Sequence, residues 1–264
     1  MQIYLSIIDR KTAIVLLLCV TIAFFCMQLG YRSNLNITLF SLAVIFPLVF
    51  TIREAFKRRD NVIQLLSVFK SSLNGVYYLL MNNSKMPLAE KLSIAKELES
   101  LSHLFFDSLY SNKNDATKTR SKLTDVFEII LLSKKTIPNG LAIRIFRYLK
   151  DTQESMENTI GISMHGTPVS LRAYCLVFIY FFPFIFVPTL IGETDNYSTF
   201  AVYLVCAAPG FILISLYNIQ ERMEDPFDQS GLDDIKVEEF IWLLPKSANE
   251  GVGQDEDAAE SKTP

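Results

Sequence analysis

Four long stretches of the chain contain no charged residue, and the charged and polar residues gather between them. The stretches run from Thr12 to Leu29, Ile37 to Ile52, Ala173 to Ile191 and Thr199 to Tyr217. The second is short, but the charged segment Arg53 to Arg59 that follows it could prolong the same helix into water. A helix rises about 1.5 Å per residue, so stretches of this length nearly cross a hydrocarbon core of about 30 Å. The pattern therefore predicts four membrane-spanning helices and a multi-pass integral membrane protein that contacts the lipid bilayer directly.

The first stretch follows Arg10 and Lys11, as the apolar core of a cleaved signal peptide would. It is longer than a typical core of about 7 to 15 residues, and Gln28 to Tyr31 is not a small-residue cleavage site. We therefore favour a retained span, with Gly30 to Asn36 as the turn of a membrane hairpin.

Between the second and third stretches, apolar residues recur every three or four positions, which is typical of amphipathic helices. Two such series are Val62, Leu65, Leu66, Phe69, Leu73, Val76, Tyr77 and Leu80, then Leu88, Leu92, Ala95, Leu98, Leu101, Phe105 and Leu109. Ser111 to Asp115 indicates a loop, and helices resume at Thr124 to Leu132 and, after a break at Pro138, at Gly140 to Gln153. The predicted fold class is all-α: four membrane helices and a helical bundle.

Charge predicts the orientation of these helices in the membrane. From Arg53 to Ser170 there are 17 Lys and Arg residues against 12 Asp and Glu, and Arg53, Lys57, Arg58 and Arg59 adjoin the second span. By the positive-inside rule we expect the central segment to be cytoplasmic, and an even number of spans puts both termini there too.

These patterns divide the chain into five predicted segments. They are an N-terminal segment with spans one and two (1–58), a cytoplasmic helical domain (59–170), spans three and four (171–220), a cytoplasmic acidic segment (221–250) and a disordered tail (251–264).

Composition argues against several classes of protein. Half of the residues are hydrophobic, which is too apolar for an ordinary soluble domain. The four cysteines all lie within the apolar stretches, so no zinc or redox site is predicted. The two histidines, His103 and His165, belong to no catalytic or metal-binding motif, so we expect no enzyme. Basic residues alternate with acids instead of forming a patch, so nucleic-acid binding is not predicted either.

The second stretch carries Leu42, Phe46 and Phe50 at intervals of four residues. This spacing puts all three on one face of a helix. Such a face packs against a neighbouring helix or lipid in most proteins. Alternatively, symmetry-related copies could form an aromatic ring, whose electropositive edges suit anions and whose constriction can lose its water.

Acidic residues follow the fourth stretch at Glu224 to Asp228, which includes Asp225, Pro226 and Phe227, and again at Asp233 and Asp234. Asp225, Asp228, Asp233 and Asp234 offer oxygen ligands suited to calcium, although their spacing is not that of an EF-hand loop. A helix-capping turn accounts for the same residues equally well.

Three separated segments resemble the bestrophin anion-channel family, in particular its bacterial-type members. They are Phe50 to Arg58 (FTIREAFKR), Thr167 to Tyr174 (TPVSLRAY) and Met223 to Asp228 (MEDPFD). The resemblance implies four membrane helices and a cytoplasmic helical domain in each of five subunits around a central pore. It also implies that Leu42, Phe46 and Phe50 match the hydrophobic neck of that pore.

The chain departs from the family pattern at two places. Arg58 is followed by Arg59-Asp60 where the family has two tryptophans, and Pro47 lies inside the neck. The animal members hold calcium with acids after the Pro-Phe pair, but Gln229 and Ser230 stand at positions where acids are expected. We therefore predict no required cofactor and weak or no dependence on calcium, and Glu224 to Asp228 is expected to be chiefly a structural turn.

The leading hypothesis is a homo-oligomeric, pentameric channel that favours anions such as chloride. Two alternatives stay open: a non-transporting scaffold whose cytoplasmic helices bind a partner, and a cation-selective channel of the same fold.

Overall fold

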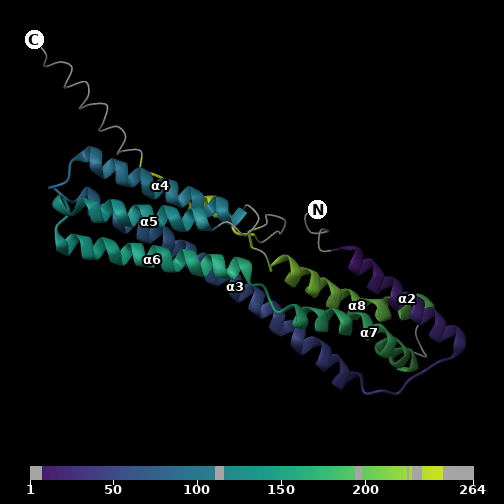
Figure 1. Ribbon diagram of the computed structural model, residues 1–264. Coiled ribbons are helices and arrows are strands. Elements are labelled where there is room, and N and C mark those ends of the chain that lie inside the picture. Colours follow the sequence, from purple (N-terminus) through teal and green to yellow (C-terminus); the bar gives the residue numbers. More distant parts are fainter. Residues whose placement is uncertain (1–7, 111–115, 194–197, 225, 228–233, 246–264) are drawn as a thin grey trace, which may run out of the picture. The chain divides into compact units, whose positions relative to one another are not determined.

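The computed structural model describes residues 8–245 except for 111–115, 194–197, 225 and 228–233. Within these residues the chain forms helices and no strands. The helices are α2 (Arg10–Leu29), α3 (Ile37–Met81), α4 (Leu88–Tyr110), α5 (Thr117–Leu132), α6 (Asn139–Met164), α7 (Val169–Glu193) and α8 (Thr199–Arg222), with the short 3₁₀ turns η1 (Ser133–Lys135) and η2 (Val237–Phe240) (Figure 1). The predicted all-α fold class is confirmed.

Four helical regions are long and apolar enough to cross a membrane: α2, α3, the stretch Asn139–Gly192 and α8. Within Asn139–Gly192 the charge-free run Ala173 to Ile191 belongs to α7, whereas α6 carries charged residues along its length. The four predicted spans are confirmed, and the protein is a multi-pass membrane protein.

Local sequence determines where α2 begins and ends. Asp9 caps its first turn, and the Thr12 hydroxyl accepts a hydrogen bond from the Asp9 backbone, which completes a capping box. Gly30 ends the helix at φ 65°, a left-handed conformation that glycine adopts without steric cost. The chain thus turns after Leu29, where the sequence predicts the hairpin.

The chain forms two compact units. The first, called the membrane unit here, comprises residues 1–60 and 165–234, and the second unit comprises 61–164 and 235–264. Helix α3 contributes its first part to the membrane unit and its remainder to the second unit.

In the membrane unit, α2, α7 and α8 pack closely against one another. Gly210 of α8 allows the close approach of α2, because a Cβ atom there would lie 2.8 Å from Cys19 Sγ and 3.2 Å from Val15 Cγ1. Two clusters of buried apolar residues fill the interior, one that includes Leu48 and Ile179 and another that includes Ala23 and Val187.

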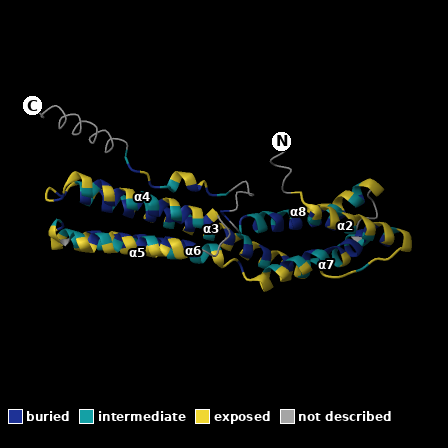
Figure 2. Ribbon diagram, turned by 45° about the horizontal axis from the view of Figure 1, so that its top comes forward, coloured by how far each residue is buried: buried dark blue, intermediate teal, exposed yellow. Residues whose placement is uncertain are grey.

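In the second unit, α4, α5, α6 and the end of α3 lie side by side (Figures 1 and 2). Phe69 of α3 meets Phe105 of α4 with ring centroids 4.6 Å apart, and both are fully buried. Gly75 of α3 faces the Tyr148 ring of α6, and a Cβ atom at position 75 would lie 2.8 Å from it. The two amphipathic series seen in the sequence supply this core.

After α8 the chain returns to the second unit through residues 235–244. Trp242 is buried there, with its ring nitrogen donating to Asn74 Oδ1 at 2.7 Å and its backbone nitrogen donating to Ser102 Oγ at 2.8 Å. The Leu244 backbone nitrogen donates to Glu99 Oε1 at 3.1 Å. This C-terminal strap, Ile235 to Leu244, is therefore joined to both α3 and α4.

Helix α3 continues from the second span past Arg53 through residue 81, in agreement with a span prolonged by the charged segment that follows it. The helix boundaries differ from the sequence-based prediction in two places: α5 begins at Thr117 instead of Thr124, and α6 extends to Met164 instead of Gln153. The added turns are rich in charged residues, Thr and Ser. Helices accept these residues, but apolar residues are then too sparse to show the helical periodicity. The predicted loop at Ser111 to Asp115 and the predicted disordered tail lie outside the described residues. The five-segment division stays a prediction.

Candidate pore-lining surface

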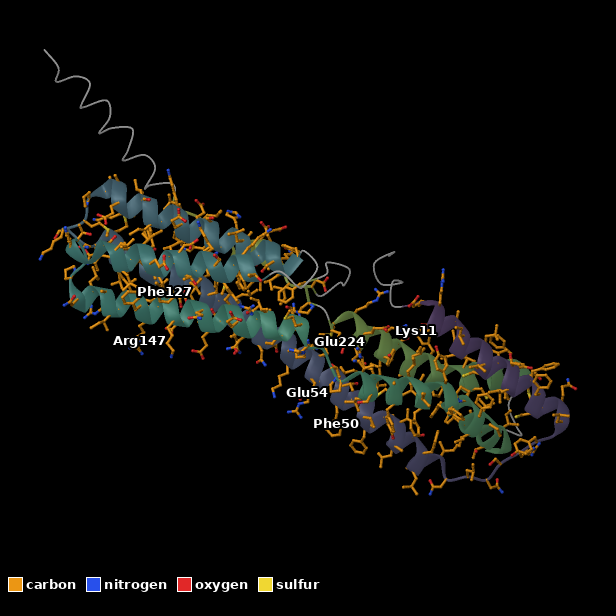
Figure 3. All side chains as sticks on the ribbon, in the orientation of Figure 1. Lys11, Phe50, Glu54, Phe127, Arg147 and Glu224 are labelled. Atoms are coloured by element: carbon orange, nitrogen blue, oxygen red, sulfur yellow. The ribbon has the colours of Figure 1, made fainter. Side chains whose placement is uncertain are left out.

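Helix α3 has one exposed apolar face in the membrane unit. Leu42, Phe46 and Phe50 are 48%, 51% and 56% exposed, and the Phe46 and Phe50 rings lie near each other with centroids 6.2 Å apart. Figure 3 shows Phe50 on the side of α3 turned away from α7 and α8. The three residues with the predicted four-residue spacing thus share one uncovered surface.

The opposite face of α3 is buried. Val44, Leu48 and Thr51 are at most 2% exposed, and the Thr51 hydroxyl donates to the Leu48 carbonyl at 2.8 Å. Phe40 stacks on Phe182 of α7 at 6.2 Å between ring centroids, so aromatic side chains join the two helices. Because one side of α3 is fixed in this way, the exposed stripe has a defined direction.

Pro47 lies within α3, between the exposed and buried stripes. Proline has no backbone N–H and removes one hydrogen bond of the helix, yet α3 continues on both sides of it. The presence of Pro47 therefore does not interrupt the helix that carries the stripe.

The segment after α8 is anchored by Glu224, whose side chain is 9% exposed. One carboxylate oxygen accepts a hydrogen bond from Arg172 Nη1 at 2.5 Å, and the other accepts from the Thr167 backbone nitrogen at 3.0 Å. Pro226 and Phe227 are buried. Glu224 therefore joins the end of α8 to the start of α7, as in the structural turn expected from the sequence.

A second ion pair lies at the same end of the membrane unit. Lys11 Nζ of α2 donates to both carboxylate oxygens of Glu221 in α8, at 2.7 and 2.5 Å, and lies 5.3 Å from the centre of the Tyr217 ring. One turn earlier in α8, Asn218 Nδ2 donates to the Thr12 hydroxyl at 2.9 Å. These contacts hold α2 against α8.

Of the four acids considered as calcium ligands, the structure describes one. Asp225, Asp228 and Asp233 lie outside the described residues, and Asp234 is half-buried. Among the described residues, no three His, Cys, Asp or Glu side chains gather closely enough to hold a metal ion. The calcium assignment stays a prediction that these residues do not test.

The second unit has a shallow pocket of about 310 Å³ between α5 and α6. Its lining includes Arg120, Phe127 and Glu157. Arg120 Nε and Nη2 donate to the two Glu157 carboxylate oxygens at 2.6 and 2.7 Å, so its charged groups neutralise each other. This pocket offers no unsatisfied charge for a ligand.

Comparison with solved structures identifies the architecture. A variant of a bacterial bestrophin homologue from Klebsiella pneumoniae aligns with 88% of this chain and 93% of its own, at a TM-score of 0.75 and 15% sequence identity. A second variant of that homologue gives a TM-score of 0.73 at 15% identity, with 88% and 95% covered. The chain has the bestrophin fold.

The bestrophin fold confirms at the level of architecture what three short segments of the sequence suggest. A further structure described as a membrane protein aligns with 92% of this chain and 96% of its own, at a TM-score of 0.72 and 13% identity. No family model matches the sequence, and no curated protein is similar to it in sequence.

Sequence reasoning missed two groups of residues that hold the bestrophin fold together here. Arg172 and Thr167 bind Glu224 from more than fifty positions away, and no periodicity pairs them. The second group is the C-terminal strap. Its sequence contains one signal that could have revealed it, since Trp242 is a lone tryptophan in an acidic segment and therefore a strong candidate for burial.

Proposed function

We propose that this protein is the subunit of a pentameric ion channel that favours anions such as chloride. Its narrowest part would be a neck lined by Leu42, Phe46 and Phe50. The observation that carries the proposal is the exposed stripe of these side chains on α3, in a chain with the bestrophin fold and with segments that resemble a family of anion channels.

Exposure of apolar residues does not by itself distinguish a pore from lipid contact. Phe181 and Phe184 of α7 are also exposed, at 60% and 54%. We favour α3 because Leu42, Phe46 and Phe50 match the neck in the family resemblance. The opposite face of α3, with Val44 and Leu48, packs into the core that α2, α7 and α8 share. The free face of α3 is available to other copies of the chain.

Several copies would turn this face into a constriction. A ring of leucine and phenylalanine side chains binds water poorly, so a narrow ring can lose its water and block ions until it widens. The positive edges of the phenylalanine rings favour a passing anion over a cation. One copy has too few spans to enclose a pore, so the function requires assembly.

The positive-inside rule orients the proposed channel. Basic residues next to the second span indicate that the second unit and both termini are cytoplasmic. The proposed neck would then lie within the membrane, with Phe50 at the end of it that is nearer to the cytoplasm.

The neck is tested by replacing Phe46 and Phe50 with alanine together. Removal of both rings widens the constriction and makes water loss harder, so we expect chloride flux from reconstituted vesicles to rise about tenfold or more. The measurement is chloride efflux from liposomes at a fixed number of oligomers per vesicle.

The matched control replaces Phe181 and Phe184 with alanine. These residues are exposed to a similar degree and, like Phe46 and Phe50, have ring centroids 6.2 Å apart. We expect unchanged flux from this control. Equal flux from the wild-type protein and the neck variant, both assembled, would refute the neck, and no flux from an assembled wild-type protein would favour the scaffold alternative.

A further inference from the structure

The exposed stripe of α3 does not end at Phe50. The next exposed residues on the helix are Arg53, Glu54, Phe56 and Lys57, and Ala55 between them is fully buried. Figure 3 shows Glu54 next to Phe50 on the same side of α3. The surface that is apolar within the span therefore becomes charged directly after it.

Helical geometry relates these charges to the proposed neck. At 100° and about 1.5 Å per residue, Arg53, Glu54 and Lys57 lie about 4.5, 6 and 10.5 Å beyond Phe50 along the axis. Lys57 is seven positions after Phe50, almost in line with it, and Arg53 and Glu54 lie on either side of that line. All three point to the same region of space as the neck residues.

Arg53 and Lys57 flank the second span, where the positive-inside rule expects basic residues, but these charges make no contact that holds helices together. No hydrogen bond or ion pair to another described residue involves the side chain of Arg53, Glu54 or Lys57. By contrast, Glu221 and Glu224 each bind a basic residue of a neighbouring helix. Three charges that have no partner on another helix, at one end of an apolar stripe, suit an aqueous path better than a packing surface.

We propose that Arg53 and Lys57 form a basic collar at the inner mouth of the neck and select anions, with Glu54 reducing their effect. This inference rests on the proposed function, and it names the residues that decide which ions pass. Each copy contributes two positive charges and one negative charge, so five copies would give a collar of net charge about +5.

The size of the effect follows from screened electrostatics. The Debye length is about 8 Å at physiological ionic strength, close to the distance from these side chains to an ion on the axis of a narrow pore. The effect of one charge on an ion in the pore is small at this distance, but a symmetric ring repeats it in every subunit. We therefore expect the selectivity to weaken as the salt concentration rises.

The test measures reversal potentials of the full-length protein in planar bilayers under a gradient of sodium chloride. In R53E together with K57E, the summed charge of positions 53, 54 and 57 in each copy changes from +1 to −3, and we expect the ratio of chloride to sodium permeability to fall at least about tenfold. E54Q removes the opposing charge, and the ratio should rise by about threefold. These two changes in opposite directions are the specific signature of the collar.

Two controls separate the collar from other effects. R10E reverses one charge, half the change made by R53E with K57E, at an exposed residue at the start of α2, and R53K with K57R keeps the charge; neither should move the reversal potential. If R53E with K57E does not assemble, E54Q and R53Q test the collar instead, because each makes a smaller change in charge. R53Q should then lower the ratio of chloride to sodium permeability.

The outcomes distinguish this inference from the proposed function. An unchanged reversal potential in a conducting protein whose neck variant has altered flux would overturn the collar alone. The collar also fails if the charge changes alter only the dependence of flux on phosphatidylglycerol content, since the residues would then bind lipid headgroups. A wild-type oligomer without conductance overturns both.

Discussion

At the scale of single residues, the acidic segment after α8 shows how a candidate ligand can prove to be a structural group. Glu224 stands among acids suited to calcium, yet both of its oxygens accept hydrogen bonds, from Arg172 and from the backbone of Thr167. Arg172 is 31% exposed, so water only partly compensates for the loss of its partner. The pair should contribute more than an ordinary surface ion pair.

Glu224→Ala is therefore expected to destabilise the membrane unit by about 2 kcal/mol, because Arg172 loses its partner in a partly buried site. The measurement is the midpoint of thermal unfolding in detergent. Glu224→Gln, which keeps an acceptor for the Thr167 nitrogen, should cost less.

The control for this variant is Glu221→Ala. Glu221 also pairs with a basic residue, but its side chain is 40% exposed, so we expect a loss of about 1 kcal/mol or less. Equal midpoints for the two alanine variants would contradict a special role for Glu224.

At the scale of helices and segments, the C-terminal strap depends on one side chain. Trp242 is 1% exposed and contacts the Tyr77 ring at 5.8 Å between centroids, whereas its neighbour Leu243 is 58% exposed. Ile235 and Val237 are also buried, but their smaller side chains bury less apolar surface. Trp242 is thus the main anchor of the strap.

Trp242→Ala should release the strap from α3 and α4. Removal of a buried tryptophan costs about 3 to 5 kcal/mol, which is comparable to the whole binding energy of so short a segment. Limited proteolysis followed by mass spectrometry should show faster cleavage between residues 235 and 245. Leu243→Ala is the matched control, and equal cleavage rates for the two variants would show that the strap is held by other contacts.

At the scale of the whole molecule, the proposed channel requires several copies of the chain. Native mass spectrometry of protein in a mild detergent should therefore find five subunits. A monomer in both detergent and lipid nanodiscs would remove the pore, because the exposed face of α3 would have no partner.

The sequence predicts the spans well, because a helix without charge over about 16 or more residues is rarely found outside a membrane. It also predicts that Leu42, Phe46 and Phe50 share a face, since residues four apart do so in any helix. Whether that face lines a pore stays a prediction, because periodicity describes one helix and a pore involves several chains.

The rest was not predictable for a physical reason. The contacts of Glu224 and Trp242 join residues that are between 52 and 168 positions apart, and local patterns contain no information about such pairs. The continuity of α3 past Arg53 was different, because the charged segment Arg53 to Arg59 could prolong the second span as one helix, and it does so.

The burial of Trp242 has a practical consequence for spectroscopy. It is the only tryptophan in the chain, and it lies in the second unit, so intrinsic tryptophan fluorescence reports on the strap and is silent about the membrane unit. A buried indole that becomes exposed shifts its emission to longer wavelength. Any stimulus that loosens the strap, whether an ion, a lipid or a change of pH, would therefore be visible in the native protein without an added label.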